Sequence, residues 1–541
     1  MADAGSRIER SRRGRADPAC VFRDGCDLYA SVATGSGQAS LRGASGALLP
    51  EGGARLRQSW DGGRGHHDRQ RLPRGDGAGV HAAAARGLDR RRDRAGGPIR
   101  LALPAAEPRC ATGMMEAVNA PSPPDAMTRF LVTWSALGTI LAVLVPLATP
   151  VLLGGSMLMP LLLADRPELG QRFWKIGPTT ALMLVICLYL AVNASWSPAS
   201  RNAAMAVAMV VLATLAAHVA TVAFPLMRAE QVDALRRGLV IGLLVGLAIL
   251  AFEYVTRMSG QRALKSLLDT LGVRGVRIET GNWLHPRNQG MTRNLGFVVP
   301  IVWIGLAACL RINRADSRSA GALIFALAAV SVLVSPSATA KIGLTAGAIG
   351  ALGALWFPQL TLAGLTAAWV FLCAAVVPVA HLLYRLRLYD AAWIHETGRH
   401  RIAIWGATSD WYWSAPIFGA GLASAREQPA LDAAHADALK NLSATAKLNW
   451  HAHNGYLQVW YEAGAVGGLL FMLLGLALLH AVRKSDDVVK PLLIGAFASF
   501  TFFIATGFSL WAAWYIGALG LVIVSAQLTG AELPGGAAKP R

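Results

Sequence analysis

A histidine and an amide stand where a long polar segment of the chain runs into a long apolar one. They are His453 and Asn454, and a Gly-x-x-Gly pair, Gly464 and Gly467, follows inside the apolar run. Histidine is the natural general base near neutral pH. An ionisable group at a membrane boundary costs free energy unless something offsets that cost, so it is a functional candidate by default. The competing interpretation is an ordinary helix start, at which His453 packs and Asn454 caps the first turn.

Arg385, Arg387, Arg399 and Arg401 precede this histidine in the polar segment 384–454. If the residues around Arg401 are helical, Arg401 and Trp405 share a face at i, i+4, and the indole can hold the guanidinium in place. A guanidinium makes two charge-assisted hydrogen bonds to a phosphate and stays protonated. The segment therefore predicts a phosphate site, with a surface-exposed basic turn as the alternative.

Two further cations are candidates for the same site. Lys341 follows the small residues that begin at Ser337, and it either approaches a ligand or extends its amine to the membrane interface. Arg287 belongs to the segment 257–288, in which leucines recur at helical spacing and indicate an amphipathic helix lying at the interface. The two interpretations are compatible, because the helix can lie on the membrane while Arg287 points into a site.

The other residues of the motif have structural interpretations. Glu462 lies nine residues into the expected helix and requires a buried partner, which favours an orienting role over catalysis. Gly464 and Gly467 favour close helix packing over contact with a substrate. His451 and His453 lack a third ligand at a recognisable spacing, and none of the six cysteines has metal-ligand spacing to another, so no metal site is predicted.

The composition of the 541 residues indicates a membrane protein, because 54% are apolar and only 15% are charged. From Phe130 onward, successive apolar runs of about 17–25 residues are each long enough to cross the hydrocarbon core as a helix. The runs are continuously apolar rather than alternating, which favours helices over a barrel. We expect an all-α, polytopic integral membrane protein with about 12 transmembrane helices, nine over 130–383 and three over 455–528.

Short loops rich in arginine and lysine follow the expected second, fourth, sixth and tenth spans. Such loops favour the cytoplasm, so this side is predicted to hold the segment 114–129 and the tail 529–541 as well. The opposite side then receives the outer loop 257–288 and the large loop 384–454. Residues 384–454 are too many for a tight connection, and long loops of this kind are usually functional.

Residues 1–113 differ from the rest of the chain in composition. They carry 20 arginines, no lysine and 12 acids in a background of glycine and alanine without apolar periodicity. One interpretation is a disordered basic arm that binds nucleic acid or anionic lipid. The interpretation that we favour is a mis-annotated extension translated upstream of the true start, with Met114, Met115 or Met127 as the initiator.

The run from His453 to Gly467 resembles the His-[Asn/Ser/Gln]-x9-Gly-x-x-Gly signature of the bacterial O-antigen ligases. Related O-antigen and exopolysaccharide polymerases and the protein O-oligosaccharyltransferases share much of this signature. Arg401-x-x-x-Trp405, followed by Gly419-Ala420-Gly421, is similar to the Arg and Gly-x-Gly of the family's large periplasmic loop. His285 to Asn288 is similar to its Asn-Pro-Asn, and Ser337 to Lys341 resembles its Ser-Arg motif with lysine in place of arginine. The resemblance covers about residues 130–528.

This resemblance implies a metal-independent, inverting membrane glycosyltransferase with a GT-C-like fold in the bacterial inner membrane and no cofactor. Its donor would be a glycan linked through pyrophosphate to undecaprenol. Its acceptor would be lipid A-core or a second lipid-linked glycan, with membrane lipids around it and no nucleic acid as partner. His453 would be the base that deprotonates the acceptor hydroxyl at the periplasmic face. Arg401 would hold the pyrophosphate, with Arg385 or Arg387 as a second cation.

A transporter is the alternative from another class, because twelve spans is a common transporter count. Transporters place ionisable residues and broken helices near the membrane midplane, often in two corresponding halves. Here Glu253 and Glu462 are the only acids well inside the expected spans, and no internal repeat is evident. The large outer loop with its cations favours chemistry at the surface. Within the enzyme class, no residue separates a ligase from a polymerase.

Overall fold

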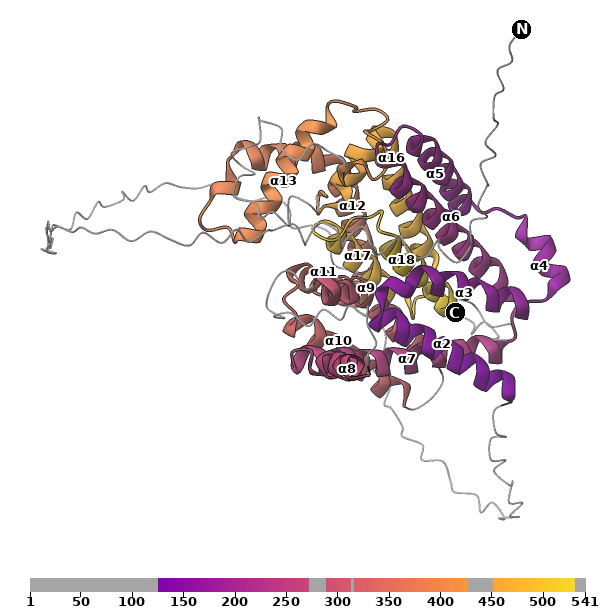
Figure 1. The fold of residues 1–541 in the computed structure, drawn as a ribbon. Helices are drawn as coiled ribbons and strands as arrows, with labels where there is room; N and C mark the ends of the chain where they lie inside the picture. Colours follow the sequence, from indigo (N-terminus) through magenta and orange to yellow (C-terminus); the bar gives the residue numbers. More distant parts are fainter. Residues whose placement is uncertain (1–124, 272–288, 313–315, 427–450, 531–541) are drawn as a thin grey trace, which may run out of the picture. The chain divides into compact units, whose positions relative to one another are not determined.

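The computed structural model describes residues 125–271, 289–312, 316–426 and 451–530, and every regular element in these ranges is helical (Figure 1). Residues 1–113, Arg287 and the tail beyond Gly530 lie outside the described ranges. In chain order, the elements are α2 (Ala126–Leu144), η2 (Pro146–Ala148), α3 (Thr149–Leu163), α4 (Arg166–Phe173), α5 (Pro178–Ala194), α6 (Ser200–Ala223), η3 (Phe224–Leu226), α7 (Ala229–Val255), α8 (Ser259–Thr270), α9 (Gln289–Arg311), α10 (Ser317–Val334), α11 (Ala338–Trp356), α12 (Pro358–Arg385), η4 (Leu388–Asp390), α13 (Glu396–Tyr412), η5 (Ser424–Arg426), α16 (Gly455–Lys484), α17 (Lys490–Ile504) and α18 (Ala513–Gly530).

Ten of the described helices are long and apolar enough to cross a membrane. The bent pair α4 and α5, with an angle of 62° between its parts, brings the number to eleven. Helix α17 is apolar but shorter, with 15 residues. The expectation of an all-α, polytopic membrane protein is therefore confirmed, whereas the predicted number of 12 spans is not established.

Small residues allow the longest helices to pack closely. Gly238, Gly242 and Gly246 recur every four residues along α7 and face α2. A Cβ atom at Gly238 would lie 2.5 Å from the Val132 carbonyl oxygen, and one at Gly242 would lie 2.6 Å from the Ala136 oxygen. Because lipid gives no hydrophobic drive for two spans to associate, this close approach is what holds α2 against α7.

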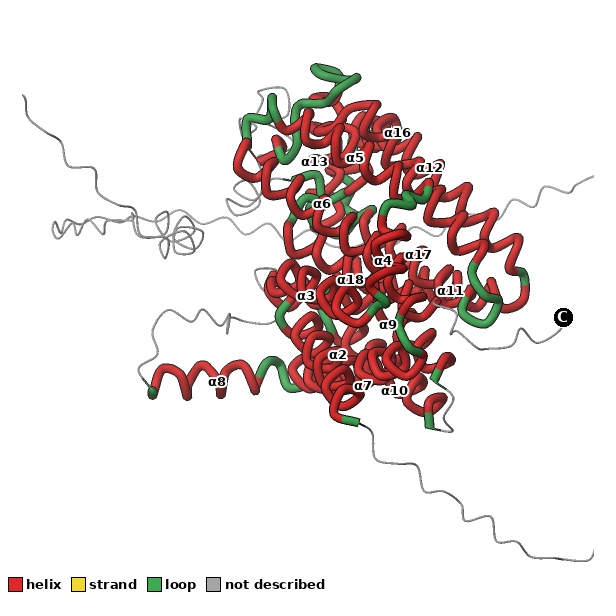
Figure 2. Tube along the Cα trace, turned by 90° about the vertical axis from the view of Figure 1, so that its right-hand side faces the viewer, coloured by secondary structure: helices red, strands yellow, loops and turns green. Residues whose placement is uncertain are grey.

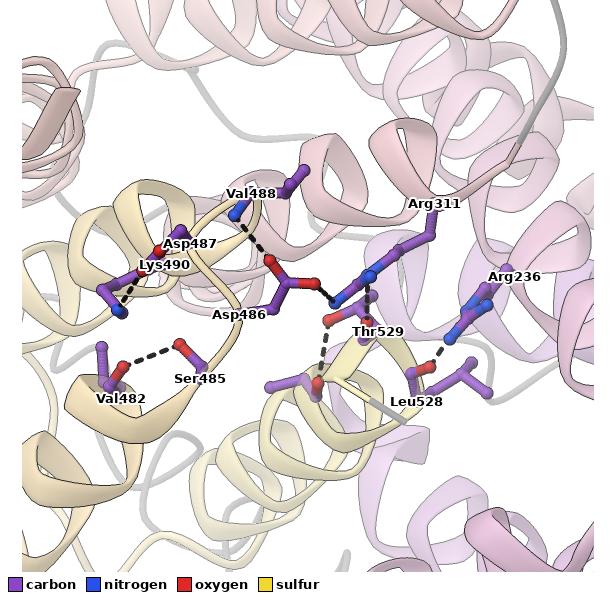
Figure 3. Close-up of polar contacts among 11 residues, drawn as sticks. Arg236, Arg311, Val482, Ser485, Asp486, Asp487, Val488, Lys490, Leu528 and Thr529 are labelled. Carbon is purple, nitrogen blue, oxygen red and sulfur yellow. Dashed lines mark hydrogen bonds and ion pairs between the residues drawn. The ribbon is translucent and has the colours of Figure 1, made fainter. Parts of the chain in front are cut away.

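Arg236, in the first part of α7, connects that helix to the end of α18 (Figure 3). Its side chain is 1% exposed. The Nε atom donates a hydrogen bond of 3.0 Å to the Leu528 carbonyl, and Nη1 lies 3.1 Å from Asp233 Oδ1. One guanidinium thus satisfies a carbonyl in the last turn of α18, which has no partner within its own helix.

Arg311, the last residue of α9, makes a second connection of this kind (Figure 3). Its Nε donates to the Thr529 carbonyl at 3.1 Å, and its Nη2 forms an ion pair of 2.9 Å with Asp486, between α16 and α17. Three of the loops predicted to share one side of the membrane therefore lie together. We call this side inner, after the predicted orientation, and the opposite side outer.

The amphipathic helix predicted in segment 257–288 is present as α8, which projects from the end of α7 (Figure 2). The side chains of Leu264, Leu267 and Leu271 are exposed by 50%, 55% and 65%. A row of exposed leucines on a short helix with charged residues between them is typical of a helix that lies on a membrane surface.

Candidate functional site

Helix α13 carries Arg401 to the outer ends of the membrane helices. His395 caps its first turn, and the helix packs against α12 and α16 (Figure 1). The half-buried Arg401 has its Nη2 3.5 Å from Thr339 Oγ1, in the first turn of α11. Among the residues that the structure describes, no carboxylate is paired with Arg401. Burial lowers the pKa of its guanidinium from the ordinary value, although the group remains a cation near neutral pH.

Trp405 joins α13 to the segment that carries the histidine. Its Nε1 donates a hydrogen bond of 2.8 Å to the Ala452 carbonyl, and its ring packs in a cluster with Leu457 and Tyr412. Arg401 and Trp405 lie one turn apart on α13, as their i, i+4 spacing predicted, but their side chains contact different elements. Arg401 extends toward α11, while Trp405 fixes the backbone next to His453.

His453 lies directly before α16 in a left-handed backbone conformation, with φ of 48°. Asn454 begins the helix, because its Oδ1 accepts a hydrogen bond of 3.1 Å from the Leu457 amide. The His453 ring lies near the Gly507 carbonyl in the turn between α17 and α18, and the centre of its ring is 3.8 Å from that of His451. With Asn454 as the cap, the imidazole of His453 is left to other contacts.

Burial, and then the nearby His451 and Arg401, hold the pKa of His453 well below the ordinary value of 6.5. Each of these effects disfavours the imidazolium form. His453 is therefore neutral near pH 7, which is the state that can accept a proton. The effect of Arg401 also shows that the two side chains are within electrostatic reach of one another.

The turn between α17 and α18 connects the base to the cation. Thr339 Oγ1, which lies next to Arg401, donates to the Thr506 carbonyl at 3.0 Å, and the next residue, Gly507, lies near His453. The structure thus brings together three parts that are far apart in the sequence, namely α11, α13 and the start of α16, around a turn that the sequence did not single out.

Helix α16 is broken at Gly464, where φ is 65° and ψ is −169°. A loop after α13 pairs with the broken backbone. The Ala465 amide donates to the Pro416 carbonyl at 2.9 Å, and the Ala420 amide donates to the Tyr461 carbonyl at 3.0 Å. Only glycine adopts this conformation at low cost, and a Cβ atom here would collide with the loop. The sequence predicted that Gly464 packs against another helix. This prediction is wrong, because Gly464 packs against the loop after α13.

Gly467 fits the predicted role, because a Cβ atom there would lie 3.3 Å from the ring of Tyr189 on α5. Glu462 also has the buried partners that the sequence required. Its carboxylate is 0% exposed and accepts hydrogen bonds from the Ala423 amide at 3.0 Å and the Ala425 amide at 3.1 Å. Glu462 therefore holds the loop after α13 against the half of α16 that begins next to His453.

Four side chains from the end of α5 and the turn after it hold the same loop, and sequence reasoning missed them. Asn193 Nδ2 donates to the Phe418 carbonyl at 2.8 Å, and Ser197 Oγ donates to the Leu422 carbonyl at 2.6 Å. The complete set is Tyr189, Asn193, Trp196 and Ser197. The only signal in the sequence was a group of polar and aromatic residues at the end of an apolar run.

No hydrogen bond in the described part of the chain joins the remaining predicted cations to Arg401 or His453. Arg385, at the end of α12, donates from Nε to His381 Nε2 at 3.2 Å, and Arg387 forms an exposed ion pair of 2.9 Å with Asp390. The buried Nε of Arg399 has no hydrogen-bond partner among the described residues. Lys341 is half-buried in the first turn of α11, close in sequence to Thr339. The prediction for Arg287 falls outside the described residues.

Two cavities adjoin α16. One, of about 580 Å³, is almost wholly apolar and lies mainly between α5, α6, α16, α17 and α18. The other, of about 520 Å³, lies between the outer part of α12, the end of α13 and Trp460 of α16. Both volumes lie in the range of pockets that bind small molecules.

Residues 323–472 match the family model described as O-antigen ligase. This part of the chain is an O-antigen ligase-like domain. The matched residues include Lys341, Arg401, His453 and the broken part of α16, so the domain spans the outer site described above. A search of the curated proteins gave no match to the chain. Together with the many apolar helices, the O-antigen ligase domain indicates a multi-pass membrane protein with a glycosyltransferase-like activity.

Proposed function

We propose that the chain transfers a glycan from undecaprenyl pyrophosphate to an acceptor hydroxyl at the periplasmic face of the bacterial inner membrane. One observation carries the proposal. A neutral histidine, His453, lies within electrostatic reach of Arg401, a half-buried guanidinium without a carboxylate partner among the described residues. A base beside a cation that lacks an anion is the arrangement that this transfer requires.

In the proposed reaction, the acceptor oxygen attacks the anomeric carbon, and its proton passes to the ring of His453. The bond between that carbon and the pyrophosphate oxygen breaks, and its electron pair leaves with the pyrophosphate. Arg401 stabilises the negative charge that develops on the leaving group, so that the positive charge comes from a guanidinium rather than from a metal ion. Attack from the face opposite the leaving group inverts the configuration of the sugar.

The first turn of α11 adds a second source of positive potential. The Ser337 side chain caps this helix by accepting from the Ala340 amide at 3.2 Å, and Lys341 follows one residue later. The N-terminus of a helix carries a partial positive charge that favours anions. We assign Lys341 and the start of α11 a supporting role beside Arg401, and Asn454 a role in placing His453.

The large apolar cavity fits the polyprenyl part of the donor. Its lining runs from Tyr189 and Ala463, at the break of α16, to Ser485 and Gln527 on the inner side. An isoprenoid chain has no polar group to satisfy, and this lining offers few. The pyrophosphate would then leave the cavity at the outer ends of α16 and α18, toward Arg401.

The test is transfer by the purified chain in liposomes, with an undecaprenyl-pyrophosphate-linked glycan as donor and either lipid A-core or a second lipid-linked glycan as acceptor. His453→Ala is expected to lower the transfer rate by about 10³-fold, within the range for loss of a general base. His480→Ala, which removes an exposed histidine near the other end of α16, is the matched control. Equal rates for the two variants would disprove the role of His453, and the acceptor that is used decides between ligase and polymerase.

A further inference from the structure

The second cavity, between α12, α13 and α16, is separate from the contacts of Arg401 and His453. The cavity wall nearest to His453 contains Val377 and Tyr412, which pack in one cluster with Ala452 and Leu457. Ala452 precedes His453, so this cluster forms a wall between the cavity and the base. Leu382, 55% exposed on α12, lines the same cavity, which therefore borders on the surface that α12 presents to lipid.

Among the described residues that line this cavity, Arg385 is the only arginine or lysine, and a hydrogen bond orients its guanidinium. Arg385 Nε donates to His381 Nε2 at 3.2 Å, so the ring proton of a neutral His381 lies on Nδ1, which is 2.8 Å from Asp410 Oδ1. The three side chains form a hydrogen-bonded series that holds the guanidinium by its Nε. Its two terminal nitrogens have no hydrogen-bond partner among the described residues and remain able to bind a phosphate.

Aromatic rings form the rest of the wall. Trp413 is 65% exposed, its ring centre is 5.0 Å from that of Tyr412, and Tyr412 is 5.9 Å from Trp460. Such surfaces pack against the apolar C–H faces of sugar rings, while their polar edges remain near water. An acyl chain would need no fixed cation, and a free phosphate would need no aromatic wall. The combination suits a sugar that carries both a phosphate and a lipid.

We propose that this cavity binds the head group of the acceptor, a phosphorylated glycolipid of the outer leaflet, with its phosphate on Arg385 and a sugar ring against Trp413. The inference rests on the proposed function, because that reaction joins two lipid-anchored substrates at one base. The apolar cavity on the α5 side would receive the donor, and this cavity would bring the acceptor to the opposite side of α16.

The first measurement is binding, which needs no turnover. The full chain in nanodiscs is titrated with a diglucosamine lipid that carries one phosphate, with its dephosphorylated form, and with phosphatidylglycerol. The phosphorylated glycolipid is expected to bind about tenfold more tightly than either of the others. Equal affinity for phosphatidylglycerol would overturn the proposal, because the cavity would then be a general site for anionic lipid.

Three variants locate the binding. Arg385→Gln is expected to remove most of the tenfold preference for the phosphorylated form, and Trp413→Ala to weaken both glycolipids equally. Arg262→Gln removes an exposed cation on α8 and serves as the control for long-range electrostatics. If Arg385→Gln and Arg262→Gln bind the phosphorylated glycolipid alike, the assignment of Arg385 is wrong.

The kinetic measurement separates this proposal from the function on which it rests. Arg385→Gln is expected to raise the KM for the acceptor about tenfold while kcat and the KM for the donor stay unchanged. A raised KM for the donor would place Arg385 in the pyrophosphate site instead. His453→Ala is expected to lower transfer about 10³-fold and to leave glycolipid binding intact. Absence of transfer by the wild-type chain would disprove the proposed function, whereas the binding titration would still decide on the cavity.

Discussion

Arg236 and Arg311 at the inner end of the helix bundle and the half-buried Arg401 at the outer end differ in their polar partners. At the inner end, Arg236 lies against Asp233 and Arg311 against Asp486. Each of the two arginines also binds a carbonyl of α18 (Figure 3). At the outer end, Arg401 meets only a threonine hydroxyl at 3.5 Å among the described residues. Arg236 and Arg311 are neutralised by carboxylates within the chain, whereas Arg401 has no carboxylate partner among the described residues.

This difference separates stability from binding. Removing a guanidinium from water costs free energy that a carboxylate or a carbonyl can offset. The inner pairs supply that compensation, so those arginines need nothing further. Arg401 bears this cost without a carboxylate partner in the described part of the chain. An anionic ligand would supply the missing compensation. Substitutions at the inner end should therefore change stability, and substitutions at the outer end should change activity.

Among the arginine substitutions, Arg401→Gln has the largest expected effect, and this effect is on transfer. Loss of the cation that stabilises the leaving pyrophosphate should lower kcat/KM about 100-fold, with little change in thermal stability, because no internal ion pair is broken. Arg401→Lys keeps the charge and should recover part of the rate. The measurement is the initial rate of glycan transfer in liposomes. A loss of thermal stability without a specific loss of rate would place Arg401 in the same class as the inner arginines.

At the inner end, Arg236→Met should lower the free energy of unfolding by about 2 kcal/mol, because it leaves the Leu528 carbonyl and Asp233 without their partner. Transfer by the folded fraction should not change. Unfolding in mixed micelles, followed by tryptophan fluorescence, measures the effect. Arg237→Met is the matched control, because the buried Nε of Arg237 has no hydrogen-bond partner among the described residues. Equal losses for the two variants would refute a specific contribution of Arg236.

The pH dependence of transfer tests whether Arg401 and His453 act as one site. Because the pKa of His453 is held well below 6.5, kcat/KM should stay constant as the pH falls through 6.5 and should decline only at lower pH. Arg401→Gln removes one of the effects that lower this pKa, so the acid limb should move to higher pH. Arg401→Lys should leave the limb in place. An unchanged limb in Arg401→Gln would show that the two groups are not coupled.

The same pKa has a consequence for stability. The unfolded chain protonates His453 near 6.5, whereas the folded chain does not. Stability should therefore be unaffected above that pH and should fall as the pH drops from 6.5 toward the lower pKa of the folded state.

The smallest expected effect comes from Asp486→Asn, which breaks the ion pair with Arg311. Asp486 is 37% exposed at its side chain, and water screens the pair, so the loss of stability should stay under about 1 kcal/mol. The Thr529 carbonyl still accepts from Arg311 in this variant. Unfolding at low and high salt is the measurement. A loss above that of Arg236→Met would reverse the order of the two inner contacts.

Periodicity in the sequence was enough to predict the helices and part of the site. Apolar runs predicted the long helices, and the spacing of Arg401 and Trp405 predicted one face of α13. The motif around His453 and Asn454 predicted a helix start with the right cap. Each of these predictions depends on residues within a few turns of one another, where the chain's own geometry decides which side chains are neighbours.

The break of α16 was not predictable in this way. Gly464 has a left-handed conformation because a loop more than 40 residues earlier supplies the hydrogen bonds that the helix lacks there. Asn193, on α5, completes the arrangement from a distance of 225 residues along the chain. Arg387 illustrates the opposite error. The family resemblance implied that Arg387 could share the site of Arg401, but its φ of 55° after the end of α12 leaves it exposed beside Asp390.

The inner contacts also set an order of assembly. Arg236 binds a carbonyl 292 residues further along the chain, and Arg311 binds one 218 residues further along. The ribosome makes α7 and α9 long before α18. Both guanidinium groups therefore lack these acceptors until α18 has been synthesised. The inner end of the bundle can therefore close only when α18 has been inserted. In a nascent chain arrested within α17, Arg236 and Arg311 would both lack the α18 carbonyls that they bind in the complete bundle. Quality control could use this feature to distinguish an unfinished bundle from a complete one.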